Sequence, residues 1–254
     1  MQQAEIITLS NQKGGSGKTT TAHALGAGLR ARGHKVLFVD LDSQGNLTYA
    51  LGIDNKALTS LEVLTGTATA EEAIQETTTG DIIPASPALS GANEIITETG
   101  KEYRLKEALE PIRSRYDYII LDTSPALSVL TVNALTASDK LVIPSEADTF
   151  SLQGIVGISS TIAAVKKYFN KELRTDGILL TRFKPRTNLS KEIAGFADQI
   201  ANMMQTKVYQ NTIRENISIR MAQANRTDIF SYDPKSNGAA DYNAFIDEFL
   251  KEGK

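Results

Sequence analysis

The chain contains no cysteine and no tryptophan, and only two histidines occur among its 254 residues. Without cysteine, disulfide bonds, thiolate catalysis and iron–sulfur clusters are excluded. His23 and His34 stand in no pattern typical of a zinc site. No run of about 18 apolar residues suggests a transmembrane helix, and the first residues do not resemble an export signal. We therefore expect a soluble, cytoplasmic protein.

Charge is distributed unevenly along the chain. The formal net charge is −3, but segment 166–226 holds twelve Lys and Arg against five Asp and Glu, so it carries +7 and the remainder −10. An acidic protein with such a segment can present a basic face to a nucleic acid. The alternative is that these charges only solvate helix surfaces.

Short runs of Ile, Val and Leu alternate with segments of helical periodicity. The apolar runs are 5–10, 35–40, 117–123, 140–146 and 176–181, and the helical segments are 18–32, 101–114, 126–137 and 151–169. The apolar runs do not alternate strictly with polar residues, which indicates strands buried on both faces. The order predicts an α/β fold with a doubly wound, mostly parallel sheet flanked by helices. Residues 1–254 are expected to form one domain.

Three local features refine this prediction. Gly33 should end the first helix, and Pro111 should kink or shorten the helix around it. The less regular segment 54–100 is interpreted as helices and a short strand, "DIIPA", on the same sheet.

A phosphate-binding loop, "KGGSGKTT", stands between the first strand and the first helix. Its glycines allow successive backbone N–H groups to point into one cavity, and the helix N-terminus adds partial positive charge. Lys18 is expected to reach the β- and γ-phosphates, and the Thr19 hydroxyl to ligate Mg²⁺. The predicted nucleotide-binding residues are Lys13, Gly14, Gly15, Ser16, Gly17, Lys18, Thr19 and Thr20.

Three aspartates follow predicted strands, at the edge of the sheet where ligands of open α/β folds bind. Asp122, in "YIILDTSP", fits the Walker B role of holding Mg²⁺. In "DLDSQGN", Asp40 is expected to support Mg²⁺ and the loop, and Asp42 to orient the attacking water. The sequence does not separate these two, whose roles could be exchanged. The expected metal residues are thus Thr19, Asp40 and Asp122.

These motifs resemble those of the ParA/MinD family of deviant Walker A P-loop ATPases. A standard loop reads G-x-x-x-x-G-K-[ST], but Gln12 occupies the first glycine position here and a second lysine, Lys13, follows it. "DLDSQGN" is similar to the family's "DxDPQGN", with Ser43 in place of the usual proline. The resemblance covers nearly the whole chain and is greatest to short, Soj-like ParA proteins.

The resemblance implies a homodimer that sandwiches two ATP molecules, with Mg²⁺ as the second cofactor. Lys13 would cross to the phosphates of the other subunit and act like an arginine finger in trans. The implied catalytic residues are Lys13, Lys18 and Asp42. Alternatively, Lys13 only adds positive charge to its own site. By analogy alone, Arg182 or the backbone near Ile213 would line the adenine.

The resemblance further implies a nucleoid-associated ATPase that partitions plasmid or chromosomal DNA. The ATP-bound dimer would bind double-stranded DNA non-specifically, and a ParB-like protein would stimulate hydrolysis. The predicted DNA contacts are Lys184, Arg186, Arg214 and Arg220, because Lys and Arg bind phosphates without reading sequence.

Two related functions are weighed against partition. A protein cargo could be positioned by the same cycle, and the sequence does not distinguish these cargoes. MinD-like membrane binding would need a basic amphipathic helix at the C-terminus, whereas the last helix here carries Asp241, Asp247, Glu248 and Glu252. That helix, with its apolar Phe245, is instead expected to pack on the domain, so no membrane partner is predicted.

Overall fold

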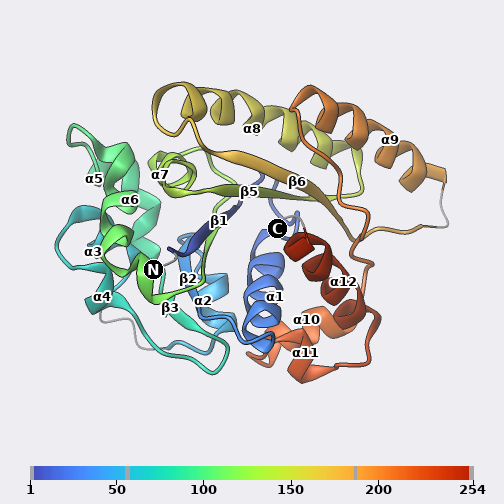
Figure 1. The fold of residues 1–254 in the computed structure, drawn as a ribbon, viewed down its shortest axis with the longest axis horizontal. Helices are drawn as coiled ribbons and strands as arrows, with labels where there is room; N and C mark the ends of the chain where they lie inside the picture. Colours follow the sequence, from blue (N-terminus) through green and yellow to red (C-terminus); the bar gives the residue numbers. More distant parts are fainter. Residues whose placement is uncertain (1–2, 55–57, 186–187, 252–254) are drawn as a thin grey trace.

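The computed structural model describes residues 3–54, 58–185 and 188–251, with the side chains of 149–152 and 188–189 left aside. Within these ranges, six parallel strands form one sheet in the order β3-β2-β4-β1-β5-β6 (Figure 1). The strands are β1 (Glu5–Leu9), β2 (Val36–Leu41), β3 (Asp81–Ile83), β4 (Tyr118–Thr123), β5 (Lys140–Glu146) and β6 (Arg174–Thr181). The five predicted strands are confirmed, and "DIIPA" contributes β3 at the edge.

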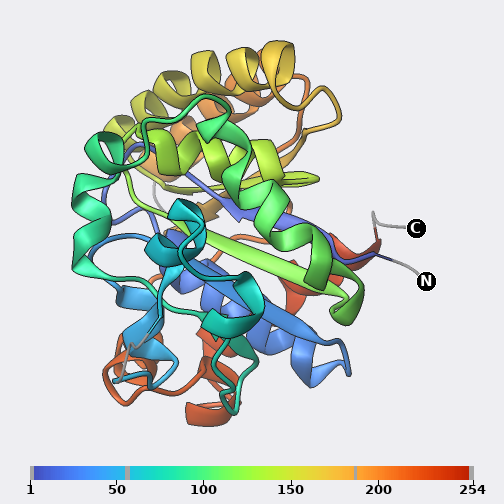
Figure 2. The same cartoon turned by 90° about the vertical axis from the view of Figure 1, so that its left-hand side faces the viewer.

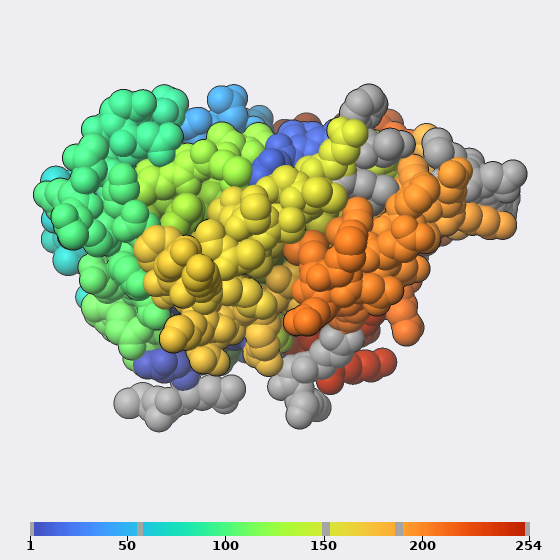
Figure 3. All heavy atoms as spheres, turned by 90° about the horizontal axis from the view of Figure 1, so that it is seen from above, coloured from blue at the N-terminus to red at the C-terminus, as the bar shows by residue number. Residues whose placement is uncertain are grey.

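Helices cover both faces of the sheet (Figures 1 and 2). One face carries α1 (Lys18–Ala31), α2 (Asn46–Ala50), α10 (Ile217–Ala224), α11 (Ile229–Tyr232) and α12 (Asn237–Lys251). The other carries α3 (Ser60–Thr65), α4 (Ala70–Ala73), α5 (Ala92–Ile95), α6 (Arg104–Leu109), α7 (Val129–Ala137), α8 (Thr149–Tyr168) and α9 (Asn188–Met203). Seen from above, α8 and α9 lie side by side on this second face (Figure 3).

The apolar strands supply a core to each of these layers. Successive side chains of a strand point to opposite faces, so Ile6 packs beneath the α3–α7 layer while Ile7 packs against α1. Phe38 also faces α1, where Gly26 leaves room for its ring, because a Cβ there would lie only 2.2 Å from Phe38 Cζ. The uninterrupted apolar runs are therefore explained by burial on both sides.

The predicted helices are confirmed with two adjustments. Gly33, at φ 90°, follows the end of α1 as expected. The predicted helix 101–114 is divided into η2 (Lys101–Tyr103), α6 and η3 (Glu110–Arg115). α6 ends just before Pro111, which cannot donate a helical hydrogen bond. The helix predicted from 126 begins later, at Val129, because the Ser128 side chain caps it by accepting from Leu130 N at 3.2 Å. A further 3₁₀ turn, η1, spans Pro87–Gly91.

The C-terminal helix packs on the domain, as its acidic outer face predicted. α12 buries Tyr242, Phe245 and Phe249 against the α1 side of the sheet. Arg32, at the end of α1, binds Asp247 with 2.6 Å between Nη2 and Oδ1. No helix in the described parts of the chain combines the length and the apolar character needed to cross a bilayer.

Candidate functional site

The loop between β1 and α1 adopts a backbone that requires glycine. Gly15 (φ 78°) and Gly17 (φ 92°) lie in the left-handed region, which side chains other than hydrogen disfavour. The end of β6 supports this loop, because Thr181 Oγ1 donates to the Ser16 carbonyl at 2.9 Å. The glycines of the motif therefore allow the loop to curl against the sheet.

Lys18 is folded into the loop that it follows. Its side chain is buried, with the residue 6% exposed, and Nζ donates to the Lys13 carbonyl at 3.0 Å. Burial lowers the pKa of Lys18, while the nearby carboxylates of Asp122 and Asp42 oppose that shift. An ammonium group thus lies at the loop with two carboxylates beside it.

Asp122 is the second-last residue of β4, in the middle of the sheet. It pairs in register with Leu9 on one side and Asp40 on the other. It is fully buried, and neither carboxylate oxygen accepts a hydrogen bond of normal geometry from the described residues. Burial raises the pKa of Asp122 well above its usual range, and the charge of Asp40 adds to this; Thr19 and Lys18 act in the opposite direction. Buried, unsatisfied carboxylate oxygens beside a threonine hydroxyl fit a hard cation such as Mg²⁺.

Asp40 has a different environment, although it is equally buried. Its Oδ2 accepts from Thr48 N at 2.9 Å and Thr48 Oγ1 at 2.7 Å, and its Oδ1 accepts from Asp42 N at 3.1 Å. Burial raises the pKa of Asp40 to about 6, against the effect of these hydrogen bonds. Asp40 thereby holds the segment that carries Asp42, and its oxygens are less available to a cation than those of Asp122.

Asp42 belongs to the same site and is 8% exposed. Its Oδ1 accepts from Gln44 N at 3.0 Å, and its carboxylate is near enough to Lys18 to affect the pKa of the ammonium. No cluster of three or more His, Cys, Asp or Glu among the described residues could enclose a metal ion. A Mg²⁺ ion here would depend mainly on phosphate oxygens and water, as it commonly does with nucleotides.

The second lysine lies at the outer rim of the loop. Lys13 Nζ is 2.6 Å from Asp148 Oδ2, and the lysine side chain is 27% exposed. Behind it, α8 approaches the loop through glycine: a Cβ on Gly154 would lie 2.4 Å from Asn11 Oδ1 and 3.1 Å from Lys13 N. Sequence reasoning missed Gly154, although an isolated glycine within a helical pattern signals close packing.

A pocket adjoins the loop on the side of α10 and α12. It is lined by Gly17, Thr20, Thr181, Arg182, Ile213, Arg214, Glu215, Asn216, Ile219, Arg220, Gln223 and Tyr242. Both Arg182 and Ile213, named above for the base, are in its wall. Sequence reasoning missed Gln223, whose Nε2 donates to Thr20 Oγ1 at 3.0 Å across 203 positions of the chain.

The basic residues predicted to contact DNA fall into separate groups. Lys184 and Arg220 are largely exposed and share Glu215, at 3.2 Å and 3.6 Å respectively. Arg186 lies outside the described residues. Arg214 is different: its Nε and Nη2 bind the Asp241 carboxylate at 2.6–3.1 Å, and its backbone N–H donates to the same group. In the structure, Arg214 therefore binds α12 to the segment before α10, a role that the sequence did not reveal.

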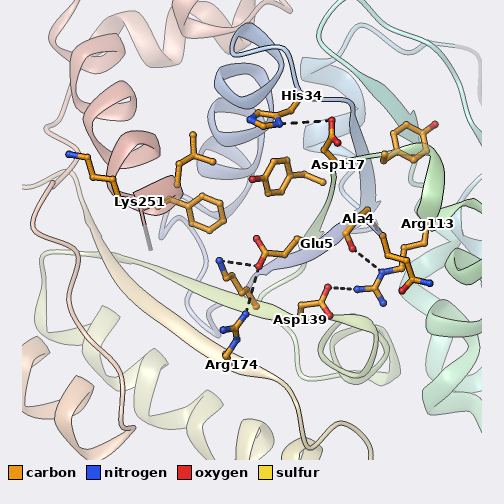
Figure 4. Close-up of a pocket in the computed structure, with 14 residues that line it drawn as sticks. Ala4, Glu5, His34, Arg113, Asp117, Asp139, Arg174 and Lys251 are labelled. Carbon is orange, nitrogen blue, oxygen red and sulfur yellow. Dashed lines mark hydrogen bonds and ion pairs between the residues drawn. The ribbon is translucent and has the colours of Figure 1, made fainter. Parts of the chain in front are cut away.

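A second hollow lies at the opposite edge of the sheet, where the strands begin (Figure 4). Arg113 lies in its wall with Nη2 at 2.5 Å from Asp139 Oδ2. Glu5 Oε1 is 3.0 Å from Lys140 Nζ and 3.8 Å from Arg174 Nη2. These charged side chains form ion pairs with one another across the strand ends, so they stabilise the fold at this hollow. The loop, Lys18 and the aspartates instead lie together at the carboxyl ends of the strands.

Known proteins are similar to this chain in sequence and in fold. The family model described as "AAA domain" matches residues 4–175. Sporulation initiation inhibitor protein Soj of Bacillus subtilis is 39% identical over 254 residues, which covers 98% of this chain and 99% of Soj. The chain belongs to the ParA/Soj-type ATPases. Chromosome partitioning protein ParA of Myxococcus xanthus is also similar to this ParA-type ATPase, at 37% identity over 251 residues, 97% of this chain and 88% of that protein.

A solved structure extends the comparison to the nucleotide. Cobyrinic acid a,c-diamide synthase from Mycobacterium smegmatis, with an ATP analogue and magnesium bound, matches the ParA-type fold with a TM-score of 0.86 and 32% identity. The match covers 99% of this chain and 97% of that one. The predicted P-loop NTPase fold is confirmed, and proteins of this fold hold a nucleotide together with magnesium.

Proposed function

We propose that this chain is a DNA-partition ATPase that dimerises around ATP, binds double-stranded DNA non-specifically in that state and releases it after hydrolysis. A ParB-like protein would stimulate the hydrolysis. The observation that supports this most directly is the assembly of Lys18, Asp122 and Asp42 at one glycine-rich loop whose rim bears a second lysine, Lys13. The similarity to Soj and ParA supports the same function.

Each residue of the loop has a role that follows from its position. Lys18, folded into the loop, would neutralise the β- and γ-phosphates. Thr19 and Asp122 would hold Mg²⁺, which neutralises charge developing on the transferred phosphoryl group. Asp42 would orient the attacking water, while Asp40 keeps the Asp42 segment in place through Thr48. We therefore propose Asp42, and not Asp40, for the water-orienting role that the sequence left open between them.

Lys13 would act on the nucleotide of the other subunit. Its side chain lies at the outer rim and is paired with an acidic side chain of its own chain. A second subunit that presents a bound triphosphate offers several negative charges in place of one. ATP then stabilises the dimer, because the closed form binds it more tightly than two separate protomers do.

The DNA-binding surface would include Lys184, Arg220 and Arg186. Lys184 and Arg220 extend from the loop after β6 and from α10, near the pocket beside the phosphate loop. Contacts of this kind are made to phosphates and weaken steeply with salt. Arg214 is left out of this surface because Asp241 engages it.

A filter or mobility assay with one random-sequence duplex would test the proposal, comparing no nucleotide, ADP, ATP and a slowly hydrolysed ATP analogue. We expect retention with the analogue, weaker retention with ATP and little with ADP. Arg220→Ala should weaken binding to every duplex alike and make its salt dependence shallower by about one unit of slope. Lys18→Ala, which removes the proposed phosphate-binding ammonium, is the control: its DNA binding should not depend on the nucleotide. Equal DNA binding in all nucleotide states would overturn the proposal.

A further inference from the structure

Helix α10 lies beside the first turns of α1, the helix that follows the phosphate loop. Its side facing α1 carries Ile219, Ala222 and Gln223, which enclose a small pocket together with Thr20 and His23 of α1. Other side chains of α10 reach solvent: Ile217 is 71% exposed, Met221 is also exposed, and Arg220 is exposed at the mouth of the pocket beside the phosphate loop. One short helix thus contacts the nucleotide-binding helix and also bears an exposed residue of the proposed DNA-binding set.

One contact between α10 and α1 is a directed hydrogen bond. Gln223 Nε2 donates to Thr20 Oγ1 at 3.0 Å. An amide NH₂ group can only donate, so the threonine oxygen is the acceptor and its own proton remains available for another acceptor. Thr20 is in the first turn of α1, directly after the lysine and threonine of the motif. A phosphate oxygen held by the loop is an acceptor that this proton can meet.

α10 is also attached to the C-terminal part of the chain. Asn216 caps the helix, and Ser218 Oγ donates to Asp233 Oδ2 at 2.8 Å. Gly238 of α12 packs so closely that a Cβ there would lie 2.7 Å from Ile219 Cγ1. α10 therefore packs with the C-terminal segment that includes α12. The hydrogen bond from Gln223 joins this segment to α1, which is distant from it in sequence.

We propose that Gln223 is a positioning residue for the nucleotide: it orients the Thr20 hydroxyl toward a phosphate and so links phosphate occupancy to α10. The ligand class is a nucleoside di- or triphosphate. The inference rests on the nucleotide binding proposed above, but it does not need dimerisation, hydrolysis or DNA.

The first test is a double-mutant cycle on Mg-ADP affinity, measured by titration of the full chain. Gln223→Met keeps the side-chain length and removes the donor, and we expect affinity to fall about fivefold, the effect of one lost hydrogen bond. In a Thr20→Val background, the same substitution should have no further effect, since no hydroxyl remains to be oriented. Gln199→Met, on the exposed side of α9, controls for loss of a glutamine. A full fivefold loss in both backgrounds would overturn the inference.

A second variant keeps the test decisive if Gln223→Met folds poorly. Gln223→Glu retains the shape, but its carboxylate accepts a hydrogen bond from the Thr20 hydroxyl and so turns that hydroxyl away from the phosphate. The affinity of this variant should fall further than that of Gln223→Met. An affinity equal to that of the unaltered protein would contradict the proposed orientation.

Hydrogen exchange measures the link to α10 directly. In the unaltered protein, Mg-ADP should slow amide exchange both in the loop and in 217–224. In Gln223→Met saturated with Mg-ADP, the loop should remain protected while 217–224 exchange as in the free protein. Protection of 217–224 in the variant would overturn the link alone. Failure of the unaltered protein to bind Mg-ADP would instead overturn the proposed function, and the link with it.

Discussion

The ammonium group of Lys13 lies 2.6 Å from Oδ2 of Asp148 in the same chain. This pair joins the loop after β1 to the segment between β5 and α8. Both side chains are between a quarter and a third exposed, and an ion pair of this kind contributes at most about 1 kcal/mol. The proposed action of Lys13 on a second subunit requires the pair to open, and a triphosphate carries enough negative charge to compete for the ammonium.

Substitution of Asp148 should therefore change the concentration of nucleotide at which two subunits dimerise. We predict that Asp148→Asn lowers, by a few-fold, the concentration of non-hydrolysable ATP analogue at which dimers form, while Lys13→Ala abolishes dimers without loss of Mg-ADP binding. Analytical ultracentrifugation across an analogue titration measures both effects. Asp198→Asn, an exposed position on α9, is the matched control. Dimers in Lys13→Ala would count against action in trans.

Asp42 and Asp40 should differ when each is replaced. Asp42→Ala is expected to bind ATP within a few-fold of the unaltered affinity and to lose at least about 100-fold in turnover, since a water-orienting group acts in the transition state. Asp40→Ala leaves the Thr48 N–H and hydroxyl without their acceptor, which should lower the free energy of unfolding by about 2 kcal/mol. Phosphate release and urea denaturation separate the two. Similar stability losses in both variants would refute the division of roles.

Gly154 should be intolerant of a side chain. The Cβ of Gly154→Ala would meet Asn11 Oδ1 at 2.4 Å, and Asn11 cannot move freely because its amide donates to the Pro144 carbonyl at 2.8 Å. We expect Mg-ADP affinity to fall at least about tenfold as the loop is displaced, in the range reported for overpacking of a close contact. Gly195→Ala, in a helix with open space around it, should preserve affinity and gain up to about 1 kcal/mol of stability. Normal affinity in Gly154→Ala would show that the loop tolerates displacement.

His23 should make stability depend on pH. Burial lowers its pKa to about 4, with the charge of Asp228 acting in the opposite direction. In the unfolded chain the pKa is about 6.5, so between pH 6.5 and 4 the unfolded state takes up a proton that the folded state does not. The free energy of unfolding therefore decreases as the pH is lowered through this window. Protonation of this one histidine in the unfolded chain accounts for a decrease of about 2 kcal/mol between pH 7 and pH 5.

His23→Leu should remove that component of the slope in urea titrations made at pH 7, 6 and 5. Only the difference in slope from the unaltered protein is diagnostic, because carboxyl groups titrate in the same range. His34→Leu, at a partly exposed position, shows what loss of the other histidine does. An unchanged slope in His23→Leu would mean that the histidine is not held neutral by burial.

Elements with a strong local pattern were predicted correctly. The runs of Ile, Val and Leu mark strands because a sheet covered on both faces needs apolar side chains on both. Asp122 could be placed next to the loop because it ends such a strand, and parallel strands bring their carboxyl ends to one edge. Pro111 also acted locally, by removing a helical donor.

Contacts between distant segments could not be predicted in the same way. Arg214 is a residue type that commonly contacts DNA phosphates, but in the folded chain Asp241 of α12 forms an ion pair with it. The sequence also does not tell Asp40 from Asp42. Only the folded backbone shows that the Asp40 carboxylate accepts a hydrogen bond from Thr48. Position 186, where a DNA contact was predicted, stays a prediction because it falls outside the described residues.

By itself, the sequence determined the order of strands and helices, the phosphate loop and the family, because periodicity and glycine-rich spacing are local properties of the chain. Tertiary structure alone decided which charges are paired and which remain exposed, how α8 approaches the loop through Gly154, and that Gln223 reaches Thr20. The reason is physical: a charge or an amide acquires its role from partners within a few ångströms, and folding brings those partners from remote parts of the chain.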